Sequence, residues 1–165
     1  MSKGHDIRAF DYVNQPYERV RTLLADSADE ILRAATSAAA SRAHDVASGL
    51  HVNLGGVEIG AEIAITVNDI EEQAGGALTT EKMQVHLEWE AAKTARLFPV
   101  MRGVLAVYPL TARETQLDFA GTYELPLGPI GSAIDAVIGH RIAEASVHRF
   151  VADIAGYLRS TLKQG

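Results

Sequence analysis

Residues 121–162, GTYELPLGPIGSAIDAVIGHRIAEASVHRFVADIAGYLRSTL, decide the fold that this sequence predicts. The stretch ends a strand, turns through the proline- and glycine-rich residues 126–129, and continues as one long helix with a wide apolar stripe. From Gly131 to Lys163 that helix would measure about 50 Å, at ~1.5 Å per residue. A strand that leads into so long a helix indicates a sheet wrapped around the helix.

The predicted helix carries two apolar faces. We expect it to begin between residues 129 and 132, because Pro129 suits a first helical position and Ser132 with Asp135 resembles a capping box. Along one face the side chains become smaller toward the C-terminus, from isoleucine to alanine. This face consists of Ile130, Ile134, Val137, Ile138, Ala145, Ala152 and Ala155. The second face gathers Val147, Val151, Ile154 and Leu158. The small residues indicate either a close approach of another backbone or room for a ligand, and both interpretations stay open.

The rest of the chain predicts a strand, two helices and then about five antiparallel strands. The first strand covers residues 7–14, and the helices begin at Pro16 and at a Ser27–Glu30 capping box. The later strands cover residues 50–54, 57–70, 82–90, 98–110 and 115–125, with a Gly55-Gly56 hairpin between the first two. The strand at 98–110 is apolar on both sides, which predicts cover on both faces.

Length and composition limit the classes of protein that the sequence allows. The 165 residues are expected to form one domain, residues 1–165, with a substantial core. A formal net charge of −6 argues against nucleic acid or an anionic membrane as a partner. The chain has no cysteine, which excludes disulfides, thiolate nucleophiles and cysteine-bound zinc. Without a signal core or an apolar run of ~18 residues, we expect a cytoplasmic protein with no stable membrane insertion. We expect it to be a monomer or a homodimer.

Two stretches give the sequence a resemblance to a known superfamily. Residues 14–20 (NQPYERV), followed by 23–26 (LLAD), resemble its strand end, proline and helix opening. Residues 121–128 (GTYELPLG), followed by Asp135 and by 141–145 (RIAEA), resemble its sheet-to-helix junction. With the order of elements, these stretches resemble the helix-grip superfamily of START lipid-transfer proteins, plant pollen allergens and polyketide cyclases. The bacterial polyketide cyclase/dehydrase-like members are the most similar.

The resemblance implies an α+β fold, in which a curved antiparallel sheet wraps around a long C-terminal helix and two shorter helices follow the first strand. It also implies an apolar cavity between the sheet and that helix. Members of the superfamily bind lipids, steroids, polyketides, plant hormones or flavonoids there. Some cyclise or dehydrate polyketides, and others act through protein partners. The motifs are structural, and no catalytic residue transfers from them.

The polar residues that could carry chemistry have no recognised motif around them. The sequence contains no phosphate loop, dinucleotide fingerprint, His-Glu-x-x-His or Gly-x-Ser-x-Gly pattern, so we predict no cofactor. His86, Glu88 and Glu90 share one strand face and could bind a divalent metal. The outward face of an antiparallel strand has the same pattern, and we favour that interpretation and predict no metal.

Arg141, His148 and Tyr123 are the candidate catalytic residues. Arg141 and His148 lie seven residues apart, near the centre of the first apolar face of the helix. A cation there could orient a carboxylate or phenolate, or polarise a carbonyl. The alternative is a position at the edge of the stripe, with polar tips in solvent. Arg102, in an otherwise apolar strand, is either an outward-facing residue or a buried cation.

The predicted ligand-binding residues come from the inward faces of the strands and the first helix face. The full set is Trp89, Phe119, Tyr123, Ile134, Val137, Ile138, Arg141 and Ala145. The aromatic members could line a pocket for a flat ligand, although large aromatic side chains are more often part of the core.

Three functions remain open at this point. The first is a binding protein for an apolar or aromatic small molecule, lipid-, steroid- or polyketide-like, held in an internal cavity. The second is a polyketide cyclase or dehydratase, which needs at least two of Arg141, His148 and Tyr123 to converge in that cavity. The third is an interaction module with a vestigial cavity, which a contiguous exposed apolar patch would favour.

Overall fold

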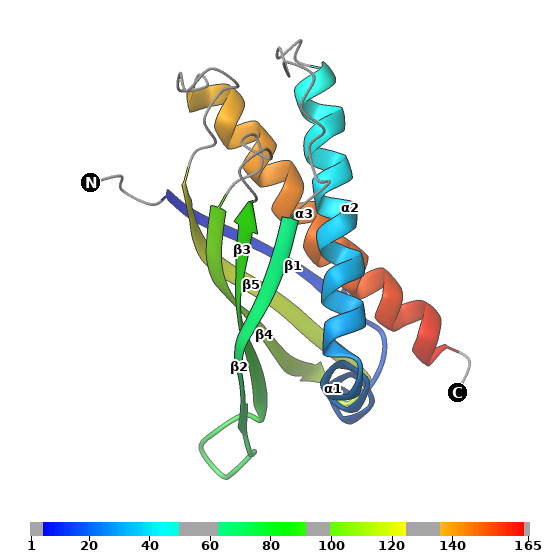
Figure 1. Ribbon diagram of the computed structural model, residues 1–165. Helices are drawn as coiled ribbons and strands as arrows, with labels where there is room; N and C mark the ends of the chain where they lie inside the picture. The colour runs from blue at the N-terminus through cyan, green and yellow to red at the C-terminus, as the bar shows by residue number, and fades with distance from the viewer. Residues whose placement is uncertain (1–4, 50–62, 92–99, 125–135, 164–165) are drawn as a thin grey trace.

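The computed structural model describes residues 5–49, 63–91, 100–124 and 136–163. Five antiparallel strands form one sheet in the order β1-β5-β4-β3-β2, and three helices complete the arrangement (Figure 1). The elements are β1 (His5–Val13), α1 (Tyr17–Asp26), α2 (Ala28–Gly49), β2 (Ile63–Gln73), β3 (Lys82–Ala91), β4 (Val100–Thr111), β5 (Glu114–Glu124) and α3 (Ala136–Leu162). The fold is α+β and of the helix-grip type, with a long C-terminal helix and two shorter helices after the first strand.

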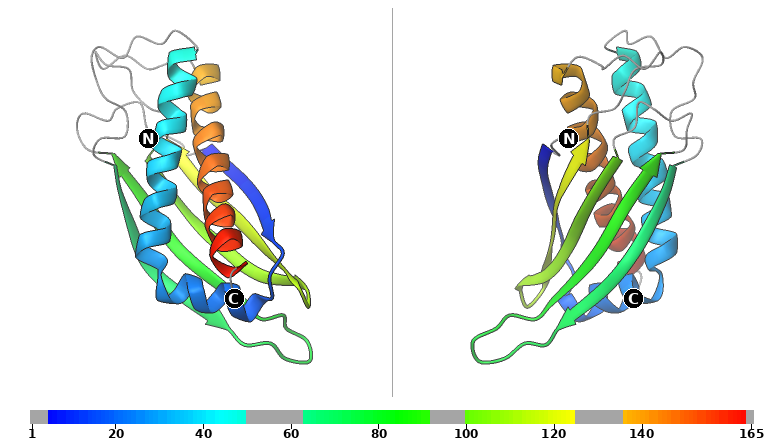
Figure 2. Two further views of the ribbon diagram at one scale, coloured as in Figure 1. Left: turned by 90° about the vertical axis from the view of Figure 1, so that its right-hand side faces the viewer. Right: turned by 60° about the vertical axis from the view of Figure 1, so that its left-hand side comes forward.

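Helices α2 and α3 lie side by side across one face of the sheet, and the opposite face carries no helix in the described part (Figure 2). A sheet covered on one side should alternate between buried and exposed residues. Strand β3 does so as predicted: Met83, Val85, Leu87 and Trp89 are buried, whereas Gln84, His86 and Glu88 are partly exposed.

Strand β4 is covered on one face only, so the prediction of cover on both faces is wrong. Met101 and Leu105 are buried against the helices, whereas the Arg102 side chain on the other face is 79% exposed. Val104 and Ala106, also on the outer face, are half-buried. Among the described elements no helix lies on this face of the strand (Figure 2).

The first two helices begin where the sequence predicts, to within one residue. The carbonyl of Pro16 accepts hydrogen bonds from the N–H groups of Arg19 (3.1 Å) and Val20 (3.2 Å), and α1 follows directly. The carbonyl of Ser27 accepts one from Ile31 (3.0 Å) at the start of α2. Proline is tolerated here because the N–H it lacks would have no partner within the helix.

Alanine residues of α2 form the contact with α3. Ala35, Ala39 and Ala43 are spaced four residues apart on one helix face and are fully buried, and α2 packs chiefly against α3. Side chains this small let two helix backbones approach closely. The alanine-rich segment is therefore a helix–helix interface, which the sequence alone did not indicate.

Helix α3 confirms one predicted face and corrects the other. Val147, Val151, Ile154 and Leu158 are buried as predicted. On the first face Ala155 is buried, but Ala145 is only half-buried and Ala152 is exposed. The buried side of that half of the helix instead carries Ile142, Ala143, Ser146 and Phe150. At about 100° per residue, Ala145 and Ala152 lie more than about 120° around the helix from Phe150, so the first predicted face and the buried side are different sides of the helix.

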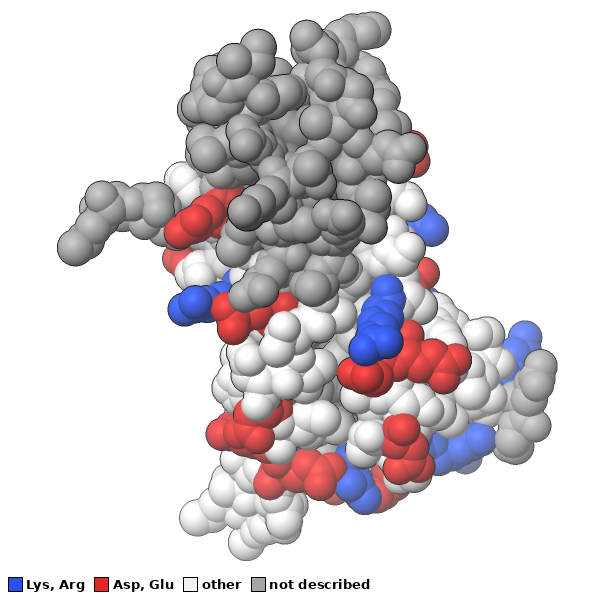
Figure 3. Space-filling view, in the orientation of Figure 1, with Lys and Arg blue, Asp and Glu red and all other residues white. Residues whose placement is uncertain are grey.

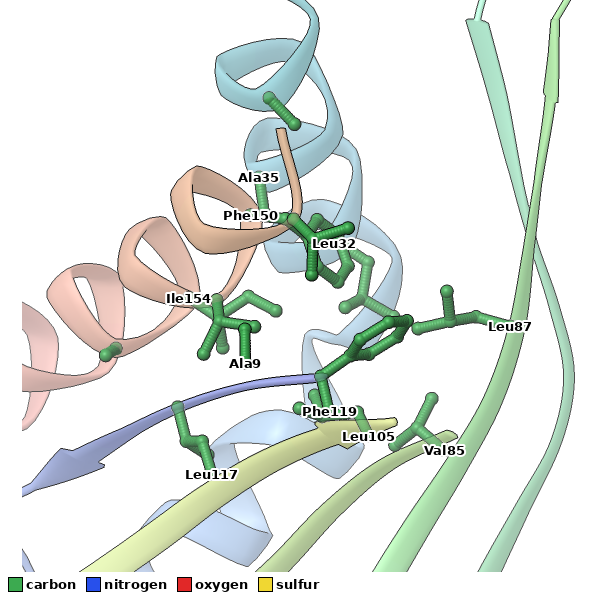
Figure 4. Packing of buried hydrophobic residues seen from close by; sticks show 14 of the residues in the cluster. Ala9, Leu32, Ala35, Val85, Leu87, Leu105, Leu117, Phe119, Phe150 and Ile154 are labelled. Atoms are coloured by element: carbon green, nitrogen blue, oxygen red, sulfur yellow. The ribbon is translucent and has the colours of Figure 1, made fainter. Parts of the chain in front are cut away.

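The core lies between the sheet and the two long helices. Figure 4 shows Phe119, Leu105 and Leu87 from the sheet facing Phe150 and Ile154 of α3. In Figure 3 acidic and basic side chains are interspersed over the described surface in view, without one large basic patch. The predicted strand at 50–54, the Gly55-Gly56 hairpin and the predicted helix start at 129–132 lie outside the described residues.

Candidate functional site

One row of inward-facing side chains crosses the sheet at the end where β5 leads toward α3. In the antiparallel register His5 pairs with Tyr123, Tyr123 with Met101, Met101 with Trp89, and Trp89 with Ile65. Met101, Trp89 and Tyr123 are at least 97% buried. Two of the aromatic residues predicted to bind a ligand thus share one row of the sheet.

Trp89 is tied to both long helices. Its indole Nε1 donates a hydrogen bond to Oγ1 of Thr36 in α2 (3.2 Å), and the Thr36 hydroxyl donates to the carbonyl of Leu32 (2.8 Å). The ring also meets Phe150 of α3 edge to face, with ring centroids 4.9 Å apart. These contacts fix Trp89 as a rigid wall of the interior.

The ring of Phe119 packs over Gly103 of β4 and Gly121 of β5, where the sheet has no side chains. A Cβ atom added at Gly103 would lie 2.8 Å from Cε2 of Phe119, and one added at Gly121 would lie 3.2 Å from Cε1. The ring is fully buried and also contacts Phe150, at a centroid distance of 6.0 Å. Around Phe119 the described interior is therefore occupied by the protein's own side chains.

Three titratable rings from three elements meet at the β1 end of the row, and we refer to Tyr123, His140 and His5 as the Tyr123 cluster. The Tyr123 hydroxyl is hydrogen-bonded to Nδ1 of His140 in α3. The His5 ring centroid lies 5.5 Å from that of Tyr123 and 4.7 Å from that of His140. Tyr123 is 3% exposed, whereas both histidines are half-buried.

The surroundings of Tyr123 keep its hydroxyl protonated. Burial raises the pKa of the Tyr123 phenol above its ordinary value, and the negative charge of Glu144 raises it further. A neutral phenol beside an imidazole can donate or accept a hydrogen bond, depending on which tautomer His140 adopts. The cluster is thus a polar contact point at the edge of an otherwise apolar interior.

The other two candidate catalytic residues do not join the cluster. Arg141 and His148 are exposed, on the side of α3 that faces away from the buried stripe. The prediction that they lie near the centre of the stripe is wrong, for the same reason as for Ala145 and Ala152. Their polar tips reach solvent, which is the alternative interpretation of their positions.

His140 is the functional candidate that the sequence did not single out. The sequence indicates an ordinary exposed helix residue at this position, whereas His140 is half-buried in the structure. Its spacing from Tyr123, at 17 residues, carries no recognisable motif. Of the remaining predicted ligand-binding residues, Ile134 lies outside the described residues, as do the side chains of Val137 and Ile138.

Ion pairs surround His86 and Glu88 on the described outer face of the sheet, and the side chain of Glu90 lies outside the described residues. Glu88 accepts hydrogen bonds from Arg102 Nε (2.8 Å) and Asn68 Nδ2 (3.0 Å), which hold the pKa of its carboxyl below the ordinary value. His86 contacts Glu71 at 3.3 Å. Within the described residues no group of three or more His, Cys, Asp or Glu side chains is arranged to hold a metal ion.

Large exposed apolar side chains are spread over the described surface. They are Phe10 and Tyr12 on β1, Ile70 on β2, Leu78 in the β2–β3 loop and Leu110 on β4. Among the helices that the structure describes, none has both the length and the apolar character needed to cross a bilayer.

Comparison with known proteins finds likeness in structure only. No family model and no curated protein matches the sequence. Among solved structures, the chain is similar to the ZhuI aromatase/cyclase from Streptomyces sp. R1128, at 13% identity and a TM-score of 0.45, covering 98% of this chain and 95% of that one. It is also similar to norcoclaurine synthase from Thalictrum flavum, at 10% identity and a TM-score of 0.45, covering 95% and 87%.

A protein from Thermus thermophilus is similar at 13% identity and a TM-score of 0.46, covering 95% of this chain and 99% of that one. One of these neighbours is thus described as an aromatase/cyclase and another as norcoclaurine synthase. At such identities and scores, neither activity carries over to this chain.

Proposed function

We propose that the protein binds an apolar or aromatic small molecule, lipid-, steroid- or polyketide-like, between the sheet and α3 at the end that carries the Tyr123 cluster. The observation that carries this proposal is a buried phenol hydrogen-bonded to a half-buried imidazole, in one row with Met101 and Trp89. Ligand sites are mostly apolar, with a few fixed polar groups that orient the ligand.

The packing of the interior favours this end of the molecule. Phe119 occupies the hollow over Gly103 and Gly121, so a ligand would not extend along the whole sheet. At the Tyr123 end the ligand's flat surface would gain from leaving water, at about 25 cal/mol per Å² of apolar area. An oxygen atom on the ligand would exchange hydrogen bonds with Tyr123 or with the histidines.

Equilibrium dialysis with two probes of one shape tests the proposal. The wild type should bind 2-naphthol about tenfold more tightly than 2-methylnaphthalene, because only the naphthol can hydrogen-bond to the cluster. Tyr123→Phe should reduce this preference, because it removes one of the polar partners in the cluster, and the exposed Tyr12→Phe should retain it. The absence of saturable binding for both probes, or an unchanged preference in Tyr123→Phe, would overturn the proposal.

A second candidate function is catalysis of a proton transfer on a polyketide-like carbonyl compound, of the cyclase or dehydratase type. The observation that favours it is the Tyr123–His140 hydrogen bond, since two groups able to donate and accept a proton converge there. The convergence involves His140 instead of Arg141 or His148.

Exchange of the acidic C–H protons of benzoylacetone into deuterium oxide, followed by ¹H NMR, tests this candidate. The wild type and Arg141→Ala should accelerate the exchange, whereas Tyr123→Phe and His140→Asn should each lose at least about tenfold. Equal rates in all four proteins would exclude this use of the cluster.

A further inference from the structure

A hollow of about 310 Å³ is lined by residues of α1 and of the ends of β2 and β3. Figure 1 shows α1 and the β2–β3 loop at the opposite end of the molecule from the end of β5. The hollow is formed where α1 begins and where β2 and β3 meet their connecting loop. Tyr17, Glu18 and Arg21 come from α1, and Glu72 and Glu81 come from the ends of the hairpin. A volume of this size holds a small molecule.

The Tyr17 side chain contributes an unpartnered hydroxyl to this hollow. Tyr17 is 5% exposed and its ring belongs to the core. Within the described part of the chain no hydrogen bond involves the Tyr17 hydroxyl, although the residue lines the hollow. Since no fully enclosed side-chain oxygen or nitrogen among the described residues lacks a partner, this hydroxyl opens onto the hollow. The Tyr17 hydroxyl is therefore available to a molecule that enters the hollow.

The charges around the hollow leave a carboxylate without a cation. Arg21 binds Glu72 (2.6 Å) and Glu18 (3.3 Å). Glu81 is half-buried and makes no ion pair among the described residues. Three carboxylates against one guanidinium give the lining a net charge of −2 (one minus three). Burial, followed by the charge of Glu81, raises the pKa of Tyr17 to about 12, which is consistent with a negative surrounding.

We propose that this hollow is a binding site for a small primary amine in its ammonium form. An alkylammonium group has three N–H donors, and the lining offers the Glu81 carboxylate, the Tyr17 hydroxyl oxygen and the Glu72 carboxylate as acceptors. Two of the three carboxylates already hold Arg21, and no described cluster suits a metal ion. The donor set thus favours an organic cation. The site is independent of the Tyr123 cluster.

NMR titration of ¹⁵N-labelled protein with n-propylammonium chloride, at constant ionic strength, tests this proposal. The amide signals of residues 17–21, 72–75 and 81 should shift in a saturable way. Tetramethylammonium chloride, which has no N–H donor, should not produce these shifts. Glu81→Gln should weaken binding about tenfold and Tyr17→Phe about threefold, because each removes one hydrogen-bond acceptor and the first also removes a charge.

The matched control is Glu30→Gln, which removes the same charge from an exposed position on α2 and should leave the affinity unchanged. Glu81→Gln and Tyr17→Phe both nearly conserve the shape of the side chain, so each should leave the fold intact. Each variant therefore tests the binding site independently of the other. Three outcomes would overturn the proposal: equal shifts with tetramethylammonium, unchanged affinity in Glu81→Gln, or tighter binding of Mg²⁺ than of the amine at the same residues.

Discussion

Gly121 has no space for even one methyl group. A Cβ atom there would lie 2.5 Å from the carbonyl oxygen of Arg102 and 3.0 Å from Cα of Gly103, and both are backbone atoms that cannot turn aside. We expect Gly121→Ala to lower the free energy of unfolding by about 1–3 kcal/mol or more. Urea denaturation measures this loss.

Gly156→Ala is the matched control for Gly121→Ala. Nothing lies within 4 Å of the position that its Cβ would take in α3. Alanine should therefore raise stability there by about 0.5–1 kcal/mol, through its helix propensity. A Gly121→Ala variant as stable as the wild type would show that the sheet at Gly121 is more open than the structure indicates.

The pKa of Tyr17 predicts how stability changes in alkali. Burial and the neighbouring carboxylates raise this pKa from 10 to about 12. Between these pH values the unfolded chain releases the Tyr17 proton and the folded chain retains it, so ionisation favours the unfolded state. The free energy of unfolding of the wild type should therefore fall between pH 10 and pH 12 relative to Tyr17→Phe. Parallel pH profiles for the two proteins would contradict this account.

At the scale of residues, the sequence predicts positions on strands better than positions on helices. The two-residue period places Trp89, Phe119 and Tyr123 inward without ambiguity, and all three are buried. On α3, consecutive side chains point about 100° apart, so an assignment that is wrong by one position takes an exposed residue for a buried one. His140 was missed and Arg141 was preferred for this reason.

Strand β1 is an edge of the sheet, and Arg159 of α3 covers part of it. Arg159 donates hydrogen bonds to the carbonyl of Tyr12 and to Asp11 Oδ1, and Asp11 Oδ1 also accepts from the Tyr12 N–H (2.8 Å). Both backbone groups of Tyr12 are thereby occupied. An edge with satisfied backbone groups resists pairing with a second chain.

Arg159→Ala should therefore increase self-association through β1. Sedimentation at rising protein concentration would show a higher weight-average mass for this variant than for the wild type. Arg33→Ala removes the same charge from an exposed ion pair on α2 and should behave like the wild type. Identical sedimentation of all three proteins would mean that Arg159 does not protect the edge.

At the scale of elements, Pro16 and Ser27 correctly predicted where α1 and α2 begin. The alternation of apolar and polar residues correctly predicted β3 and β5. The packing of α2 on α3 could not be predicted in the same way. Ala35, Ala39 and Ala43 have high helix propensity wherever they occur, so their buried role depends on where α3 lies in space.

At the scale of the whole molecule, the order of elements was enough to predict a sheet gripping a C-terminal helix. The candidate site was predictable only in part, because its residues come from three elements. Two of these elements, β1 and β5, are neighbours in the sheet but far apart in the sequence, and the third is α3. His5 begins β1, Tyr123 lies near the end of β5, and His140 lies in the first turns of α3. Only the folded chain brings these three residues together.

Binding of a small aromatic molecule at the Tyr123 cluster can be observed through intermolecular nuclear Overhauser effects between 2-naphthol and the labelled protein. We expect contacts from the naphthol protons to the rings of Tyr123, His140 and Trp89. Contacts confined to the exposed Phe10 and Tyr12 on the outer face, with none at the cluster, would contradict this expectation.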